Sequence, residues 1–421
     1  MKMGTLYDYN LLETDLYLQF TQIEDIDLLY LRGSLELNNI LRILGLGYQT
    51  FGSMGFRSLL KTLRNINTFE IFHLSEIIIC NDMAKCLAKL LKYSFSLSEI
   101  HLRNCYLSSY GVKYLSHALE SNNVLTTLNF SYNKMDICSI YYLGEALKKN
   151  QRLEILYLAN TEMGTEEIKY LMDALKVNHT LKTLNLSNNQ ISPQGMKYIA
   201  NTIKENITLV KLLLKSCNIN DLSMKSFAEA LEQNYNLEHL NLYNNVIGQE
   251  GAKYLAKYLK KNHSLRNLCM NHNHIGVTGA KYLAKSLKKN QTLIKMSLGY
   301  NFIGDEGVQY LGKMLALNKG LLFLNLVKNG MTDLGVQELQ KYLEVNPFLI
   351  NLRLSGNKVS DQIVAQIKKR TMINQENQKK LRCLQILSLE KIKKIGKKNE
   401  IKELIPVIYE SCKMKYNQII F

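Results

Sequence analysis

One pattern of 28 residues recurs along most of the chain, and it constrains the fold more than any other feature of the sequence. It is clearest in residues 237–264, which begin with the letters L-x-x-L-x-L-x-x-N-x-I and continue with G-x-x-Y-L-x-x-x-L. The first half alternates with a period of two, as a short strand does, and the second half has the i, i+4 spacing of an amphipathic helix. Neither half can bury its apolar side alone, so the pattern predicts strand–helix units that stack on one another.

The pattern keeps its register through ten repeats without an insertion or a deletion. The opening residue of these repeats is always leucine: Leu97, Leu125, Leu153, Leu181, Leu209, Leu237, Leu265, Leu293, Leu321 and Leu349. The closing residue is asparagine in nine repeats, from Asn122 to Asn346. Two weaker repeats start at Leu41 and Phe69. A degenerate repeat before them would contain the following core residues: Leu16, Leu18, Ile23, Tyr30, Leu31 and Leu35. The sequence therefore predicts a solenoid.

The repeat motif resembles that of the ribonuclease-inhibitor-like leucine-rich repeats, which also occur in NOD-like receptors and in the Ran GTPase-activating protein. The resemblance covers residues 41–376. It implies an α/β solenoid of horseshoe shape, with a parallel β-sheet on the concave face and α-helices on the convex face. It also implies that Asn245 and its equivalents turn inward and bind loop backbone, with cysteine as an alternative at Cys105 and Cys217. It implies little about function, because a shared fold does not fix the chemistry of a site.

Three regions follow from the extent of the repeats. We expect residues 1–40 to form an N-terminal cap with a degenerate first repeat, and residues 41–376 to form a solenoid of about 12 repeats. Residues 377–421 should form a basic helical cap or tail, with an amphipathic helix that ends near Gly396 and a second helix after it. The net charge of the chain is +17, which favours acidic partners.

The candidate binding residues are strand side chains that do not face the core and therefore face the concave groove. We predict that a protein partner binds there through the following residues: His101, Arg103, Tyr132, Tyr157, Lys211, Lys215, His239, Tyr243, His272, Lys295, Tyr300 and Lys328. Tyrosine and arginine are frequent anchors of protein interfaces. The alternative is that this surface is simply a solvated sheet.

A second candidate surface lies in the basic C-terminal segment. Its lysines would dock on an acidic surface of a partner: Lys391, Lys393, Lys394, Lys397 and Lys398. The alternative is that they form only the charged outer side of a cap.

Several other functions are not expected. No repeat carries a paired carboxylate for acid–base catalysis, and the glycines near residues 45–55 do not match a phosphate-binding loop. The eight cysteines form no C-x-x-C pair, so we expect neither a metal site nor any other cofactor. Nucleic-acid binding is not expected, because the groove is rich in asparagine. A membrane span and a signal peptide are not expected either, so the expected location is the cytoplasm, including the cilium or cytoskeleton.

The sequence thus favours a non-enzymatic scaffold that binds a protein through its concave β-face. The scaffold would be a free adaptor or a fixed subunit of a large assembly, such as an axonemal subunit resembling the leucine-rich-repeat member of the dynein regulatory complex. The alternative is a GTPase-activating protein resembling the Ran-directed activator, for which Arg32 and Arg42 are the early arginines available. That family has an acidic C-terminal tail, whereas this tail is basic. A third hypothesis, a fragment of a NOD-like sensor, rests on the repeats alone.

Overall fold

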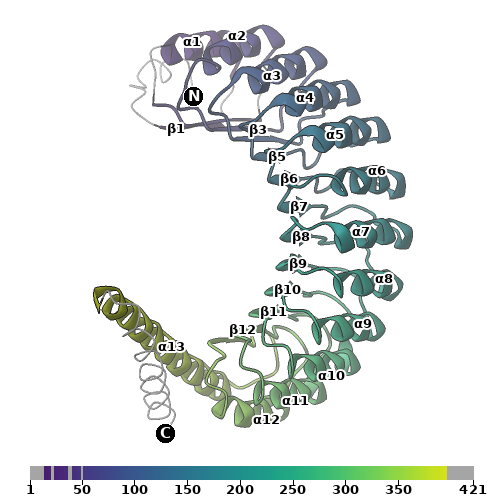
Figure 1. The fold of residues 1–421 in the computed structure, drawn as a ribbon, viewed down its shortest axis with the longest axis vertical. Coiled ribbons are helices and arrows are strands. Elements are labelled where there is room, and N and C mark those ends of the chain that lie inside the picture. Colours follow the sequence, from purple (N-terminus) through teal and green to yellow (C-terminus); the bar gives the residue numbers. More distant parts are fainter. Residues whose placement is uncertain (1–13, 20–22, 37–39, 49–50, 396–421) are drawn as a thin grey trace. The chain divides into compact units, whose positions relative to one another are not determined.

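The computed structural model describes residues 14–19, 23–36, 40–48 and 51–395, and for residues 382–395 it describes the helix but not the side chains. The chain forms two compact units, Met1–Val246 and Ile247–Phe421, which we call the N-terminal and C-terminal units. Both are built from alternating strands and helices, and Figure 1 shows the helices that connect successive strands of each unit on one side of those strands.

The described part of the N-terminal unit contains parallel strands that pair in chain order. They are β1 (Asp15–Gln19), β2 (Ile43–Gly47), β3 (Ile71–Ser75), β4 (Glu99–Arg103), β5 (Thr127–Asn129), β6 (Ile155–Tyr157), β7 (Thr183–Asn185), β8 (Lys211–Leu213) and β9 (His239–Asn241). The helices between them are α1 (Asp25–Leu35), α2 (Ser53–Leu63), α3 (Asn81–Tyr93), α4 (Ser109–Ser121), α5 (Ile137–Lys149), α6 (Thr165–Leu175), α7 (Pro193–Glu205) and α8 (Asp221–Leu231).

The C-terminal unit continues the same alternation. Its elements are α9 (Gln249–Leu259), β10 (Asn267–Cys269), α10 (Gly276–Leu287), β11 (Lys295–Ser297), α11 (Gly304–Leu315), β12 (Phe323–Asn325), α12 (Asp333–Glu344), β13 (Asn351–Arg353) and α13 (Asp361–Ile395). Strands β10 to β13 are parallel and pair in chain order. The strand–helix repeat and the leucine-rich-repeat solenoid fold predicted from the sequence are therefore confirmed.

Within each unit, neighbouring strands pair residue by residue at an interval of 28, so equivalent residues of successive repeats lie side by side. Leu128 is next to Leu156, and Leu156 is next to Leu184. These leucines are buried between the strands and the helices, together with the leucines at the corresponding helix positions. Adjacent strands lie about 4.8 Å apart, whereas packed helices need about 8–10 Å, so stacking bends each unit with its strands on the inner side.

The repeated asparagines form a ladder of hydrogen bonds at the ends of the strands. The side-chain oxygen of Asn189 accepts from the backbone N–H groups of Thr161 and Met163, both at 3.1 Å, in the preceding repeat. Its Nδ2 donates to the carbonyl oxygens of Leu158 at 2.8 Å and Leu186 at 2.9 Å. The inward orientation that the family resemblance implies is therefore confirmed.

Cysteine takes the asparagine position in two repeats. The thiol of Cys217 donates to the carbonyl oxygen of Leu186 at 3.3 Å, and the thiol of Cys105 donates to that of Leu74, also at 3.3 Å. Burial raises the pKa of each thiol to about 12, so both remain protonated donors at neutral pH.

The closing asparagines form a second ladder, at the loops that follow the helices. Asn150 donates to the carbonyl oxygens of Leu119 at 2.8 Å and Asn122 at 2.9 Å, and its side-chain oxygen accepts from the backbone N–H of Leu153 at 2.8 Å. Asn374, at the same repeat position but inside the last helix, also donates its Nδ2 to Asn346, and its other acceptor is the carbonyl oxygen of Leu349. Both loops of a repeat are thus fastened to the repeat before it.

The first described strand–helix pair, β1 and α1, differs from the prediction at one residue. Leu16, Leu31 and Leu35 are buried as expected, but Tyr30 is 47% exposed. Tyr30 therefore does not belong to the core of this repeat, whereas Leu28, which the pattern did not include, is fully buried.

The last helix is longer than the repeat predicts. Helix α13 runs without a break from Asp361 to Ile395, so it passes through the predicted boundary between residues 376 and 377. Its first part packs on the preceding repeat through buried Ile363 and Ile367. The helix predicted to end near Gly396 is therefore the second part of α13, and the second helix predicted after it lies outside the described residues.

In the part of the chain that the structure describes, no helix has the length and apolarity needed to cross a membrane.

We expect Asn189→Ala to lower the free energy of unfolding by about 2–4 kcal/mol, because it leaves buried backbone N–H and C=O groups of two repeats without partners. The neighbouring exposed residue provides a control, since Gln190→Ala should change stability by less than about 0.5 kcal/mol. Chemical denaturation followed by circular dichroism measures both. Equal denaturation midpoints for the two variants would contradict a stabilising role for the ladder.

Candidate partner-binding surface

The side chains available to a partner come from two sets of positions in each unit. The first set contains strand residues that alternate with buried leucines, such as His239 and Asn241 on either side of Leu240. The second set occupies the repeat position directly before that of Asn245, and we call it the strand-end row. We call the two sets together the N-terminal sheet face in one unit and the C-terminal sheet face in the other.

The strand-end row has an unusual backbone conformation. All of its described residues have positive φ: Tyr48, Glu76, Asn104, Tyr132, Asn160, Asn188, Ser216, Asn244, His272, Tyr300, Lys328 and Gly356. This left-handed conformation suits glycine and asparagine and costs about 1–2 kcal/mol for other residues. The tyrosine, histidine and lysine residues of the row adopt it at that cost, and such strain is found at functional positions more often than elsewhere.

A cluster of aromatic and titratable side chains lies on the N-terminal sheet face, on β1, β3 and β4. The rings of His73 and His101 stack with centroids 4.5 Å apart, and the ring of Tyr17 lies 6.1 Å from that of His73. Tyr17 reaches His73 across Gly45, where a Cβ would collide with the tyrosine ring. His101 was among the predicted binding residues, whereas His73 and Tyr17 were not, although both occupy the same repeat position as His101.

Polar neighbours fix the ring of His101. Its Nε2 lies 3.3 Å from Oε2 of Glu99, and Nδ2 of Asn129 lies 3.4 Å from its Nδ1. This arrangement fits a ring that donates from Nε2 to the carboxylate and accepts from the amide. Burial lowers the pKa of His73, and the charge that His101 gains on protonation lowers it further.

Further along the N-terminal sheet face, cations lie over aromatic rings. The guanidinium carbon of Arg103 is 4.1 Å from the centroid of the Tyr132 ring, and Nζ of Lys215 is 4.9 Å from that of Tyr243. Both cations are exposed, as is Lys211. Tyr157 is half-buried, and this burial raises its pKa. Arg103 thus contacts Tyr132, and Lys215 contacts Tyr243. His239 is half-buried on β9.

The C-terminal sheet face carries a second aromatic and basic group. The rings of His272 and Tyr300 stack with centroids 3.8 Å apart, and Nζ of Lys328 lies 5.1 Å from the Tyr300 centroid. Burial lowers the pKa of His272, and the positive charge of Lys328 lowers it further. Lys295 is exposed on β11. Arg353 faces the same side but was not among the predicted binding residues; its guanidinium carbon lies 5.1 Å from the ring centroid of Phe323.

Docking through the basic C-terminal lysines remains a prediction. Lys391, Lys393 and Lys394 belong to the part of α13 whose side chains are not described, and Lys397 and Lys398 lie outside the described residues.

Among the described residues there is no group of three or more histidine, cysteine or acidic side chains placed to hold a metal ion.

Comparison with known protein families agrees with this geometry. A family model described as "Leucine Rich repeat" matches residues 177–200, 233–256, 261–284 and 289–312. The chain contains leucine-rich repeats. The matched repeats fall in both units. No curated protein matches the chain.

Solved structures provide two further comparisons. An internalin from Listeria monocytogenes strain 4b F2365 is 17% identical, with a TM-score of 0.45, and the match covers 81% of this chain and 87% of the internalin chain. A structure titled "Leiomodin-1 Actin-Binding Site 2 (ABS2)" is 20% identical, with a TM-score of 0.28, and the match covers 32% of this chain and 79% of the leiomodin chain.

The lowered pKa of His73 predicts a pH dependence of stability. A pKa below that of the unfolded chain means that the unfolded state binds the proton more readily, so stability should fall as the pH drops below about 6.5. The loss should continue until the pH lies below the folded-state pKa. We expect His73→Phe to reduce this loss between pH 7 and pH 5.5, and His179→Phe, at an exposed position, to retain it.

Thermal or chemical denaturation at several pH values measures this dependence. The same loss of stability in wild type and His73→Phe would show that the stacked histidine pair does not resist protonation.

Proposed function

We propose that this leucine-rich-repeat chain is a non-enzymatic scaffold and that a protein partner binds its N-terminal sheet face. The observation that carries this proposal is the presence of exposed cations and partly exposed aromatic rings on the same sheet face, where Arg103 contacts Tyr132 and Lys215 contacts Tyr243. Repeat solenoids commonly use the inner side of the stack as an extended binding surface.

The chemistry of the N-terminal sheet face supports a protein ligand. Tyr157 and Tyr243 offer ring area and a hydroxyl group, and their partial burial limits the side-chain freedom that binding would remove. Among the side chains that the structure describes, Arg103, Lys211 and Lys215 form no ion pair with a carboxylate. A partner that supplies carboxylates or carbonyl oxygens would therefore meet these cations without displacing an internal carboxylate.

The geometry favours the scaffold over the GTPase activator. Activation by an arginine requires a guanidinium that can reach the γ-phosphate region of the GTPase. Arg32 lies on α1, on the helix side, where Nη2 donates to Glu36 at 2.7 Å and Nη1 donates to Ser58 at 3.1 Å. Its guanidinium therefore lies away from the sheet face.

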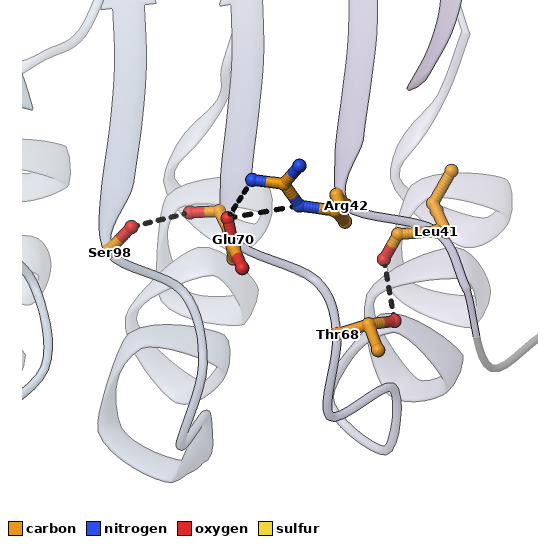
Figure 2. Close-up of polar contacts among 5 residues, drawn as sticks. All are labelled: Leu41, Arg42, Thr68, Glu70 and Ser98. Atoms are coloured by element: carbon orange, nitrogen blue, oxygen red, sulfur yellow. Dashed lines mark hydrogen bonds and ion pairs between the residues drawn. The ribbon is translucent and has the colours of Figure 1, made fainter. Parts of the chain in front are cut away.

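Arg42, the other early arginine, is also engaged. Its Nη2 and Nε donate to Oε2 of Glu70 at 2.7 and 3.3 Å, as Figure 2 shows, and Glu70 raises the pKa of Arg42 through this hydrogen bond and its charge. The surrounding loops are tied by repeated contacts, since Ser98 donates to the carbonyl oxygen of Glu70 at 3.2 Å and Thr68 to that of Leu41 at 2.8 Å. Arg42 thus forms part of the contacts between neighbouring repeats.

The same surface would serve a free adaptor in the cytoplasm or a fixed subunit of a cytoskeletal assembly, including an axonemal one. Sedimentation of native extracts separates the two, since the chain alone has a mass of 48.5 kDa. The ribonuclease-inhibitor-like subfamily is part of this proposal, and the constant 28-residue period supports it.

Substitution of three sheet-face residues tests the proposed function. We expect Tyr157→Ala/Lys211→Ala/Tyr243→Ala to lose a partner that wild type captures from native cells, by at least tenfold in recovered amount, while its circular dichroism spectrum stays unchanged. The matched control is Tyr141→Ala/Tyr170→Ala/Lys197→Ala, which removes the same residue types from exposed positions on helices α5, α6 and α7.

The control variant should keep the partner. Loss of the partner by the control, with retention by the sheet-face variant, would place binding on the helices and contradict the proposal.

A further inference from the structure

Charge is distributed unevenly between the two sides of the C-terminal unit. Its sheet face carries Lys295, Lys328 and Arg353, all exposed, and the described strand and strand-end residues of this unit include no carboxylate. The acidic residues with described side chains in this unit all belong to helices: Glu250, Asp305, Glu306, Asp333, Glu338, Glu344, Asp361 and Glu376. The sheet face is therefore purely basic, whereas the helix side carries both signs.

Lys328 is held in position by its two neighbours in the strand-end row. Its aliphatic stem lies over Gly356, where a Cβ would collide with it, and its Nζ lies 5.1 Å from the ring centroid of Tyr300. Tyr300 in turn stacks on His272. Arg353 is placed in a similar way by Phe323. These cations are partly ordered before a ligand arrives, which lowers the entropy that binding would cost.

No internal carboxylate neutralises these cations. Within the described part of the unit, Lys253 pairs with Glu250 and Lys341 pairs with Glu338, both on helices. Lys295, Lys328 and Arg353 form no such pair with any described side chain. The positive charge of the sheet face therefore remains available to an external ligand.

The aromatic rings argue for a peptide and against a nucleic acid. Binding of single-stranded nucleic acid relies on open ring faces on which bases can stack. Tyr300 lies between His272, one repeat earlier, and Lys328, one repeat later, and the ring of Phe323 is covered by Arg353. The rings hold cations in place, and a small number of cations suits a few carboxylates better than a phosphate backbone.

We propose that the C-terminal sheet face binds an acidic peptide segment of a protein partner, with Lys295, Lys328 and Arg353 receiving its carboxylates. This inference rests on the proposed protein-binding function and specifies the chemistry of the partner. The cations belong to three successive strands or strand ends, which span about 10 Å across the sheet. The three cations also lie at different positions along their repeats, so their separations are not set by the strand spacing alone. In an extended peptide, side chains on one side recur about every 6.6–6.8 Å, so a peptide with a carboxylate at every second residue offers several partners to these cations.

Binding of a defined peptide to the full-length chain tests the inference. The probe is a fluorescent ten-residue peptide of alternating Glu and Ser, compared with its Gln/Ser counterpart and with a ten-nucleotide single-stranded DNA, by fluorescence anisotropy at low salt. We expect wild type to bind the acidic peptide more tightly than either comparison ligand. Binding should weaken when the salt concentration is raised, because added salt screens exposed charges.

A matched pair of variants locates the binding. We expect Lys328→Ala/Arg353→Ala to weaken binding of the acidic peptide at least tenfold, and Lys281→Ala/Lys285→Ala to change it by less than twofold. The control removes the same net charge from exposed positions of α10 in the same unit, and Lys281 also lies over a tyrosine ring, that of Tyr310, at 5.1 Å. Equal weakening in the two variants would show a nonspecific charge effect and overturn the inference.

The remaining outcomes also decide between the alternatives. Tighter binding of the oligonucleotide, lost in Lys328→Ala/Arg353→Ala, would identify a nucleic-acid surface and overturn the inference. Failure of wild type to bind the acidic peptide would overturn it as well. The proposed function would survive either result if Tyr157→Ala/Lys211→Ala/Tyr243→Ala still loses its captured partner, so the two failures are distinguishable.

Discussion

The buried asparagine ladder is the interaction on which the rest of the structure depends. Each of its amides joins the backbone of one repeat to the backbone of the repeat before it, as Asn189 does with Thr161 and Leu158. The backbone groups it satisfies lie in a loop without regular secondary structure, where unpaired groups would be costly to bury. The ladder also fixes the turn in which the preceding residue adopts positive φ. The same interaction therefore holds the repeats together and positions the strand-end row.

Constant register has a direct consequence for the binding surfaces. Because neighbouring strands within each unit pair residue by residue at an interval of 28, side chains that are distant in sequence become nearest neighbours. Arg103 meets Tyr132, and Tyr300 meets both His272 and Lys328. Packing restricts which residue types can occupy the core positions of each repeat, whereas it does not restrict the residue types on the sheet face. Surface chemistry can therefore vary from repeat to repeat without disturbing the fold.

The two sheet faces differ in their electrostatics. The N-terminal sheet face carries carboxylates as well as cations, and Glu99 lies beside His101 within the histidine cluster. The C-terminal sheet face has cations and no described carboxylate. A mixed surface selects a partner through complementary pairs of both signs, whereas a purely basic one attracts acidic segments at longer range. The two faces are therefore suited to different parts of a partner, or to different partners.

The sequence by itself determined the strands, the helices, the core leucines and the buried asparagines, because all of them follow from a one-dimensional period that packing enforces. It also indicated which residues face away from the core, among them Tyr157, Lys211 and Lys328. Only the tertiary structure decided which of these side chains touch. The Tyr300 contacts, the reach of Tyr17 across Gly45 and the covering of Phe323 by Arg353 depend on side-chain directions in neighbouring repeats. The exposure of Tyr30 and the continuation of α13 beyond the repeat length were likewise decided there, because the periodic pattern weakens at the two ends of the stack.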